Sequence, residues 1–238
     1  MKKGKRVLTG IALVVFIGAL IFVAYELFQV RTITVAGCET RSQDDMIALS
    51  GLEYNTSIFG VDKQEVMDNI STDPYVKPVS VEIKYPDNVL ITIEERKEAA
   101  CIGKDSAFVV IDREGWVLRL ETQPEAAAAY PLVTGLPADT VLVGQQIGTS
   151  DIFKIGVLTR LIDALKSAGI APTGIDISLA ADIVITLSDG MAVEVGDDTA
   201  LNKKFALMKA SQGEITGMGK SGGILDVSSA KNAYYREK

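Results

Sequence analysis

The sequence predicts an α+β protein held at a membrane by a single N-terminal helix. Three observations lead to this fold class. An uncharged apolar run extends from Val7 to Tyr25, and a strand-helix-helix-strand-strand order follows within residues 28–97. Beyond residue 97, short alternating segments predict a β-rich domain with two helices.

The apolar run is long enough to cross a bilayer. Its nineteen uncharged residues would form a helix of about 28 Å, close to the thickness of the hydrocarbon core. The first base after it is Arg31, whereas four basic residues stand immediately before it: Lys2, Lys3, Lys5 and Arg6. By the positive-inside rule, we expect residues 1–6 in the cytoplasm, residues 7–27 in the cell membrane and the remainder outside it.

A cleaved signal peptide is the alternative interpretation of this run. The apolar part of a signal peptide usually has roughly 7–15 residues and ends in a small-x-small cleavage site. Here the run is longer, and residues 24–28 contain no such site. A retained anchor is therefore the favoured interpretation.

The external part of the chain is acidic. The formal net charge of the whole chain is −7, from 24 Lys and Arg against 31 Asp and Glu. The four bases before the apolar run leave 20 against 31 in the rest, a net charge of −11. This balance disfavours nucleic-acid binding and a second, electrostatic attachment to the membrane.

The chain has no histidine and only two cysteines. Without histidine, Ser-His-Asp and Cys-His catalysis and histidine-ligated zinc are excluded. Cys38 and Cys101 both follow the apolar run, in a compartment where a disulfide can persist. The sequence leaves two interpretations open, a Cys38–Cys101 disulfide and two free thiols.

Residues 28–97 predict a small domain. A strand is expected at 30–35, and two helices are expected to begin at the capping residues Ser42 and Asp62. Alternation over 79–85 and 89–93, around a turn at 86–88, predicts a β-hairpin. We expect the two helices to lie on one face of a three-stranded sheet.

Residues 98–229 predict a second, β-rich domain, followed by a tail at 230–238. Hairpins are expected from 108 to 120 and, around an Asp-Gly turn, from 183 to 195. Residues 123–130 suit either an exposed connection or a short helical turn. One helix is expected after Ser150 and before Gly169, another over 201–208, and a last strand at 222–227.

No motif for catalysis or cofactor binding was found. Residues 214–221 approach a phosphate-binding loop, but that motif needs glycine where Glu214 stands, so a flexible loop is predicted. The adjacent pairs Asp44-Asp45 and Asp197-Asp198 fit helix capping better than acid–base chemistry. Trp116 and Tyr130 are expected to pack. We therefore expect no enzyme, no metal and no cofactor.

Exposed strand edges are the remaining candidate sites, because another chain can bind there by adding a strand. The strand at 76–84 is expected at an edge if the second hairpin strand pairs with the first strand of its domain. The strand at 223–228 is expected at an edge because no later strand is predicted to pair with it.

Several segments together resemble the FtsQ/DivIB family of bacterial cell division proteins. They are, in order, VRTITVAGCE, SGLEYNTSIFGVD, DPYVKPVSVEIKYPDNVLITIEER and VVIDREGWVL. The resemblance runs from the apolar segment to about Leu136 and returns weakly at 223–235. It implies that residues 28–97 are a POTRA domain and that the second domain is of the FtsQ/DivIB type.

The resemblance also implies a function and partners. It implies a single-pass scaffold of the divisome that binds FtsB/DivIC-like and FtsL-like division proteins, without a small-molecule substrate. The family's partner-binding last strand falls here on a set of six residues: Ile224, Leu225, Asp226, Val227, Tyr234 and Tyr235. The alternatives are a membrane-anchored extracytoplasmic cell-wall enzyme that uses carboxylates, and a receptor with an enclosed apolar pocket.

Overall fold

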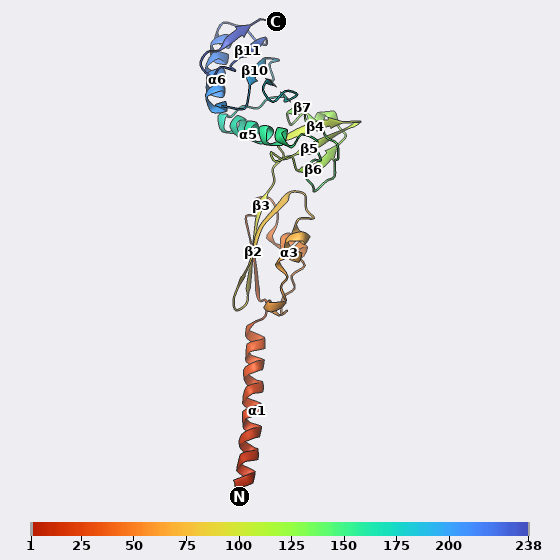
Figure 1. Ribbon diagram of the computed structural model, residues 1–238, viewed down its shortest axis with the longest axis vertical. Coiled ribbons are helices and arrows are strands. Elements are labelled where there is room, and N and C mark those ends of the chain that lie inside the picture. Colours follow the sequence, from red (N-terminus) through yellow and green to blue (C-terminus); the bar gives the residue numbers. More distant parts are fainter. Residues whose placement is uncertain (1, 238) are drawn as a thin grey trace. The chain divides into compact units, whose positions relative to one another are not determined.

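The computed structural model describes the backbone of residues 2–237 and the side chains of residues 10–237 (Figure 1). The chain divides into two compact units, Met1–Glu95 and Arg96–Lys238, which we call the N-terminal and the C-terminal unit. The fold is a mixture of helices and strands in both units, as the sequence predicted.

The N-terminal unit begins with the long helix α1, Lys2–Leu27. Its segment Gly10–Leu27 is long and apolar enough to cross a membrane, and none of that segment is buried within the protein. Among the described residues it is the one helix with these properties. The predicted N-terminal apolar helix is therefore confirmed.

The rest of the N-terminal unit has the predicted strand-helix-helix-strand-strand order. Its elements are β1 (Thr32–Ala36), α2 (Gln43–Ser50), the 3₁₀ helix η1 (Ile58–Gly60), α3 (Lys63–Ile70), β2 (Val76–Lys84) and β3 (Asn88–Glu95). The sheet order is β1-β3-β2, with β1 parallel and β2 antiparallel to β3. The expected pairing of the second hairpin strand with the first strand is confirmed.

Alternation in β3 decides which face of this sheet is buried. Val89, Ile91 and Ile93 are buried, whereas the residues between them are partly exposed. They pack into one cluster with Met46 of α2 and with α3. Since successive side chains of a strand point to opposite faces, both helices cover the same face, as predicted.

The two predicted helix caps are present. Ser42 accepts a hydrogen bond from the backbone N–H of Asp44 at 3.2 Å, and Asp62 accepts from those of Gln64 and Glu65 at 2.9 and 3.2 Å. Each cap satisfies N–H groups that have no partner inside the first turn of a helix.

Over residues 96–237, the C-terminal unit is one nine-stranded sheet with three helices. Its strands are β4 (Ala100–Lys104), β5 (Ala107–Ile111), β6 (Val117–Glu121), β7 (Leu132–Thr134), β8 (Gly174–Asp176), β9 (Ile183–Thr186), β10 (Ala192–Gly196), β11 (Ile224–Asp226) and β12 (Tyr234–Arg236). The helices are α4 (Pro124–Ala127), α5 (Ile152–Ala168) and α6 (Leu201–Gly217). The order across the sheet is β12-β11-β10-β9-β8-β7-β4-β5-β6.

Both predicted hairpins of this unit are present, as β5–β6 and β9–β10. Gly169 is the C-cap residue that follows α5, as predicted, but the N-cap residue is Asp151 and not Ser150. Of the two interpretations of residues 123–130, the short helix is the correct one.

The prediction of a flexible loop over residues 214–221 is wrong in its first half. Helix α6 continues to Gly217, and Ile215 is buried in the core. The turn of the chain therefore begins only at Met218, which is the C-cap residue of α6.

The helices α5 and α6 lie beside the sheet of the C-terminal unit (Figure 1). Leu158 and Leu161 of α5, together with Phe205 of α6, are fully buried. They belong to the same apolar cluster as Ile175, Ile185 and other strand residues. Both helices therefore share one apolar core with the strands of the sheet.

Candidate functional site

The C-terminal edge of the nine-stranded sheet is formed by β12 and not by β11. Strand β11 pairs in parallel with β10 on one side and antiparallel with β12 on the other. The expectation that the strand at 223–228 has no later neighbour is therefore wrong. The reason is that the chain reverses over residues 227–233 and returns as a three-residue strand.

Five of the six residues predicted for partner binding lie in this β11–β12 pair and Val227 directly follows β11, but the six differ in exposure. Leu225 and Val227 are fully buried and belong to the core. Ile224, Asp226 and Tyr235 are partly exposed, and Tyr234 is 60% exposed. The surface that another chain can touch is thus centred on Tyr234.

Two ion pairs hold β12 in place, and both involve residues that the sequence did not single out. Arg236 Nη2 donates to both carboxylate oxygens of Glu194 in β10, at 2.8 and 2.6 Å. Lys220 lies 2.7 Å from Glu237 and 5.9 Å from the centre of the Tyr235 ring. The neighbouring Glu237 raises the pKa of Lys220. No pattern in the sequence indicates that these charges face one another.

Backbone geometry fixes the close approach of β11 and β12. Gly223 has φ +86, and a Cβ there would lie 2.7 Å from the carbonyl oxygen of Arg236. Asp226 ends β11 by accepting a hydrogen bond from the N–H of Ser228 at 2.9 Å. Hydrogen bonding by Ser228 also lowers the pKa of Asp226. Gly223 therefore allows the close approach of the two strands just before β11, and the Asp226 carboxylate starts the turn that follows β11.

The outer edge of β12 can accept another strand. Within residues 2–237, no strand pairs with β12 on the side away from β11. Unpaired N–H and C=O groups of an edge strand are a template for strand addition, in which the main chain supplies affinity and alternate side chains supply specificity.

Strand β2 is the second candidate edge, and its predicted position at the edge of the N-terminal sheet is confirmed. Val79 is an exposed apolar residue on it. The pairing of β2 with β3 shifts between Pro78 and Ser80, and proline has no N–H to offer. Bulges and prolines are devices that block strand addition, so β2 is the less suitable of the two edges.

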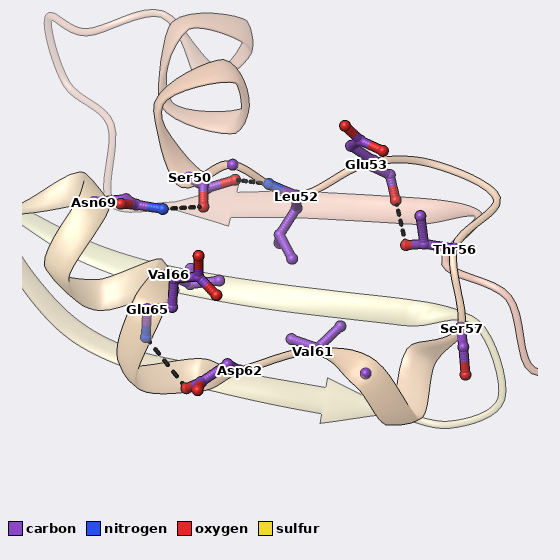
Figure 2. Close-up of a pocket in the computed structure, with 12 residues that line it drawn as sticks. Ser50, Leu52, Glu53, Thr56, Ser57, Val61, Asp62, Glu65, Val66 and Asn69 are labelled. Carbon is purple, nitrogen blue, oxygen red and sulfur yellow. Dashed lines mark hydrogen bonds between the residues drawn. The ribbon is translucent and has the colours of Figure 1, made fainter.

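A hollow of about 300 Å³ lies in the N-terminal unit, next to α2, α3 and the connection between them. Figure 2 shows that its polar groups bond to nearby turns and helix ends. Asn69 donates to the carbonyl of Ser50 at 3.2 Å, and Thr56 donates to that of Glu53 at 2.7 Å. The carboxylate of Asp62 caps α3. These polar groups stabilise the local fold, and their arrangement indicates no acid–base pair.

Among the described residues, no three or more His, Cys, Asp or Glu side chains gather in a way that could hold a metal ion. Cys38 and Cys101 are both free thiols in the structure. Cys101 is buried, and burial raises the pKa of its thiol. For Cys38 and Cys101, a disulfide and two free thiols stay the two interpretations that the sequence allows.

Comparison with known proteins identifies the type of the first domain. Residues 28–96 match the family model described as "POTRA domain, FtsQ-type". This match covers the part of the N-terminal unit that follows α1.

Curated relatives extend the similarity into the C-terminal unit. A Caulobacter vibrioides protein named cell division protein FtsQ is 34% identical over 112 residues, which are 47% of this chain and 37% of that protein. A Syntrophotalea carbinolica FtsQ is 28% identical over 203 residues, 84% of this chain and 70% of the relative. A Clostridium botulinum cell division protein DivIB is 24% identical over 209 residues, 86% of this chain and 81% of the relative. The resemblance stated from the sequence is confirmed, although the match covers only about a third of the length of the Caulobacter protein.

Proposed function

We propose that this chain, which is of the FtsQ/DivIB type by its POTRA domain and its relatives, is a membrane-anchored scaffold of the divisome. In this proposal α1 spans the cell membrane once, with its basic N-terminal end in the cytoplasm. The two units outside the membrane bind other division proteins during septum formation. FtsB/DivIC-like and FtsL-like proteins are the proposed partners.

The observation that carries this proposal is the free edge of β12 beside the exposed Tyr234. A strand of three residues offers few main-chain hydrogen bonds, so the side chains beside it must contribute to affinity. Tyrosine is among the residues that most often dominate binding energy, because it combines a large apolar ring with a hydroxyl group.

Anchoring makes a modest affinity sufficient. A protein held by a membrane helix meets other anchored proteins in a thin layer, at an effective concentration well above that in free solution. The proposed contacts at the sheet edge then need only to select the partner.

Co-purification from membranes tests the proposal. Full-length tagged protein is compared with Tyr234→Ala, with a chain that ends at Ala233 and so lacks only β12 and the residues after it, and with Tyr54→Ala as the matched control. Tyr54 is also an exposed tyrosine, at 50%, but it lies in the POTRA domain. We expect the Tyr234→Ala variant and the truncated chain to lose the FtsB/DivIC-like and FtsL-like proteins and the Tyr54→Ala variant to keep them.

The fold of each variant is checked by the fluorescence of Trp116, the single tryptophan of the chain, which lies in the C-terminal unit. If Tyr234→Ala retains a folded unit and still recovers both partners in full, the β12 edge is not the binding site. Leu225 is unsuited to this test, because it is buried and a polar substitution there would unfold the unit.

A further inference from the structure

Three aromatic rings meet at the start of the POTRA domain. The ring centres of Phe28 and Phe59 are 5.2 Å apart, those of Phe59 and Tyr85 are 5.8 Å apart, and those of Phe28 and Tyr85 are 6.3 Å apart. We call these three residues the aromatic cluster. They come from three separate segments: the residue after α1, the helix η1, and the turn between β2 and β3.

Backbone hydrogen bonds hold the three segments together. The N–H of Ile58 donates to the carbonyl of Phe28 at 3.0 Å, so η1 is fixed to the end of α1. The N–H groups of Arg31 and Thr32 donate to the carbonyl of Asp87 at 2.9 and 3.1 Å. The cluster is therefore a built feature of the domain and does not depend on loosely held loops.

The cluster is apolar but open to its surroundings. Phe59 is 67% exposed and Tyr85 is 60% exposed, whereas Ile58, next to Phe59, is completely buried. The helix η1 thus directs one large apolar side chain into the core and the next one outward. Contiguous exposed aromatic residues on a domain surface indicate a contact with another apolar phase or partner.

Covalent connection shows which phase lies next to the cluster. Phe28 directly follows the last residue of α1, and its N–H continues the helix by donating to the carbonyl of Ala24 at 3.1 Å. Whatever direction α1 takes, Phe59 and Tyr85 remain in ring contact with the residue at its end. If α1 spans the bilayer, the cluster must lie at the level where the helix leaves the hydrocarbon.

We infer that the aromatic cluster of Phe28, Phe59 and Tyr85 inserts into the outer interface of the lipid bilayer and fixes the POTRA domain against it. The inference rests on the proposed membrane anchoring by α1. Aromatic residues are favoured at this depth, because their rings contact acyl chains while a tyrosine hydroxyl reaches the headgroups. Insertion of this kind reaches about 5–10 Å into the boundary between headgroups and chains.

The proposed contact between the aromatic cluster and the bilayer is apolar, so it needs no positively charged protein surface. The acidic charge of the external part disfavours electrostatic attachment, but it does not oppose burial of phenyl rings. Binding through the cluster should therefore be the same with neutral and with anionic lipids, and insensitive to salt.

Depth-dependent fluorescence quenching tests the inference. Full-length Phe59→Trp is reconstituted into phosphatidylcholine vesicles that carry bromine near the carboxyl end or near the methyl end of the acyl chains. The matched control is Val79→Trp, at an exposed position on β2 about 20 Å along the strand from Tyr85. Unsubstituted protein gives the fluorescence of Trp116 alone, which is the background signal in both variants.

We expect the tryptophan at position 59 to lose fluorescence in brominated vesicles, more with the shallow than with the deep bromine, and to emit at a shorter wavelength than the tryptophan at position 79. The quenching and the emission wavelength of the tryptophan at position 59 should stay the same when anionic lipid or salt is added. Equal quenching of the two variants would overturn the inference.

Alkaline carbonate extraction of the same vesicles separates this inference from the proposed function. If the protein resists extraction and the tryptophan at 59 is unquenched, α1 is anchored and only the interfacial contact is disproved. If carbonate releases the protein, the membrane anchor itself fails, and both proposals fail with it.

Discussion

The two units build their sheets in different ways. In the N-terminal unit, β2 and β3 have nine and eight residues and follow one another directly in the chain. The C-terminal unit assembles nine strands of three to five residues, and its parallel pairs β4–β7, β7–β8 and β10–β11 join segments separated by long connections. A long hairpin pairs many residues that are close in the chain, although its apolar face still has to pack against helices. Short strands depend more on the helices and polar groups around them.

A buried polar network at the start of the C-terminal unit shows this dependence. Arg96 Nη1 lies 2.6 Å from Asp112 Oδ2, and the side chains of the two residues are only 7% and 5% exposed. The other oxygen of Asp112 accepts from the N–H groups of Glu114 and Trp116, both at 2.8 Å. The Arg96 guanidinium lies 4.1 Å from the centre of the Trp116 ring. One carboxylate thus joins the first residue of the unit to the β5–β6 turn.

Removing that carboxylate should give the largest effect. Asp112→Ala leaves the guanidinium of Arg96 buried without its closest partner, and breaking a buried pair costs about 3–5 kcal/mol. We expect the full-length protein in detergent to unfold at a lower urea concentration than the unsubstituted protein. The fluorescence of Trp116 follows this unfolding. Hydrogen exchange in the POTRA domain should stay unchanged.

The matched control for this variant is Asp163→Ala. Asp163 pairs with Arg113 at 2.8 Å, but both side chains are 45% exposed. An exposed pair contributes about 1 kcal/mol or less. If the two variants lowered the urea midpoint equally, the C-terminal unit would not depend on its buried network, and the contrast with the POTRA domain would be lost.

The difference in strand length between the two units also explains which strands could be predicted from the sequence. In β2 and β3, apolar and polar residues alternate over enough positions to identify both strands and the buried face. Strands β7 and β8 have three residues each, and neither was predicted. Three residues contain too little alternation to be separated from a loop, and their parallel partners lie far away in the chain.

The same limit applies to the candidate site. The segment Tyr234–Arg236 has no alternation that marks a strand, so β11 was expected at the edge that β12 in fact occupies. The position of β12 depends on Gly223 and on the Arg236–Glu194 ion pair, which joins residues 42 positions apart in the chain. The predicted residues were nevertheless brought together, because β11 and β12 are close in sequence and share one turn.

Acid pH should destabilise each unit through one carboxylate, with a smaller effect than the loss of Asp112. Glu95, the last residue of β3, accepts from the N–H groups of Glu39, Thr40 and Arg41 and from the Thr40 hydroxyl. Burial by itself raises the pKa of Glu95, but these hydrogen bonds outweigh it and lower the pKa from 4.5 to about 2. In the C-terminal unit, Asp197 has its pKa lowered from 3.8 to about 2, chiefly by the buried ammonium group of Lys204.

Both carboxylates have a lower pKa in the folded than in the unfolded chain. Their stabilisation is therefore complete above the unfolded pKa and is lost as the pH falls towards 2, from about 4.5 for Glu95 and from about 3.8 for Asp197. We expect Glu95→Gln to lower the stability of the POTRA domain at neutral pH by about 2 kcal/mol, the range for a hydrogen bond to a charged group. Hydrogen exchange of residues 39–41, corrected for the intrinsic rate at each pH, measures this change.

The control is Asp197→Asn, which should alter urea unfolding seen by Trp116 and leave exchange at 39–41 unchanged. The difference between Glu95→Gln and unsubstituted protein should narrow as the pH approaches 2, because both then lack the charge. A difference that persists undiminished at low pH would mean that the carboxylate acts by its shape and not by its charge.

The smallest effect on stability is expected at the sheet edge where we propose that partners bind. Arg236→Ala removes a largely exposed pair with Glu194, so the free energy of unfolding obtained from urea titration should change by less than about 1 kcal/mol. Strand β12 has three residues and no second neighbour among residues 2–237, so the same loss should open it locally and speed hydrogen exchange at residues 234–236 alone.

Lys231→Ala, which removes a charge of the same sign on the β11–β12 connection, is the matched control and should leave this exchange unchanged. If Arg236→Ala instead unfolds the whole C-terminal unit, β12 belongs to its cooperative core. A docking edge of that kind would then be preformed and rigid, not held in place by surface charges that a partner can replace.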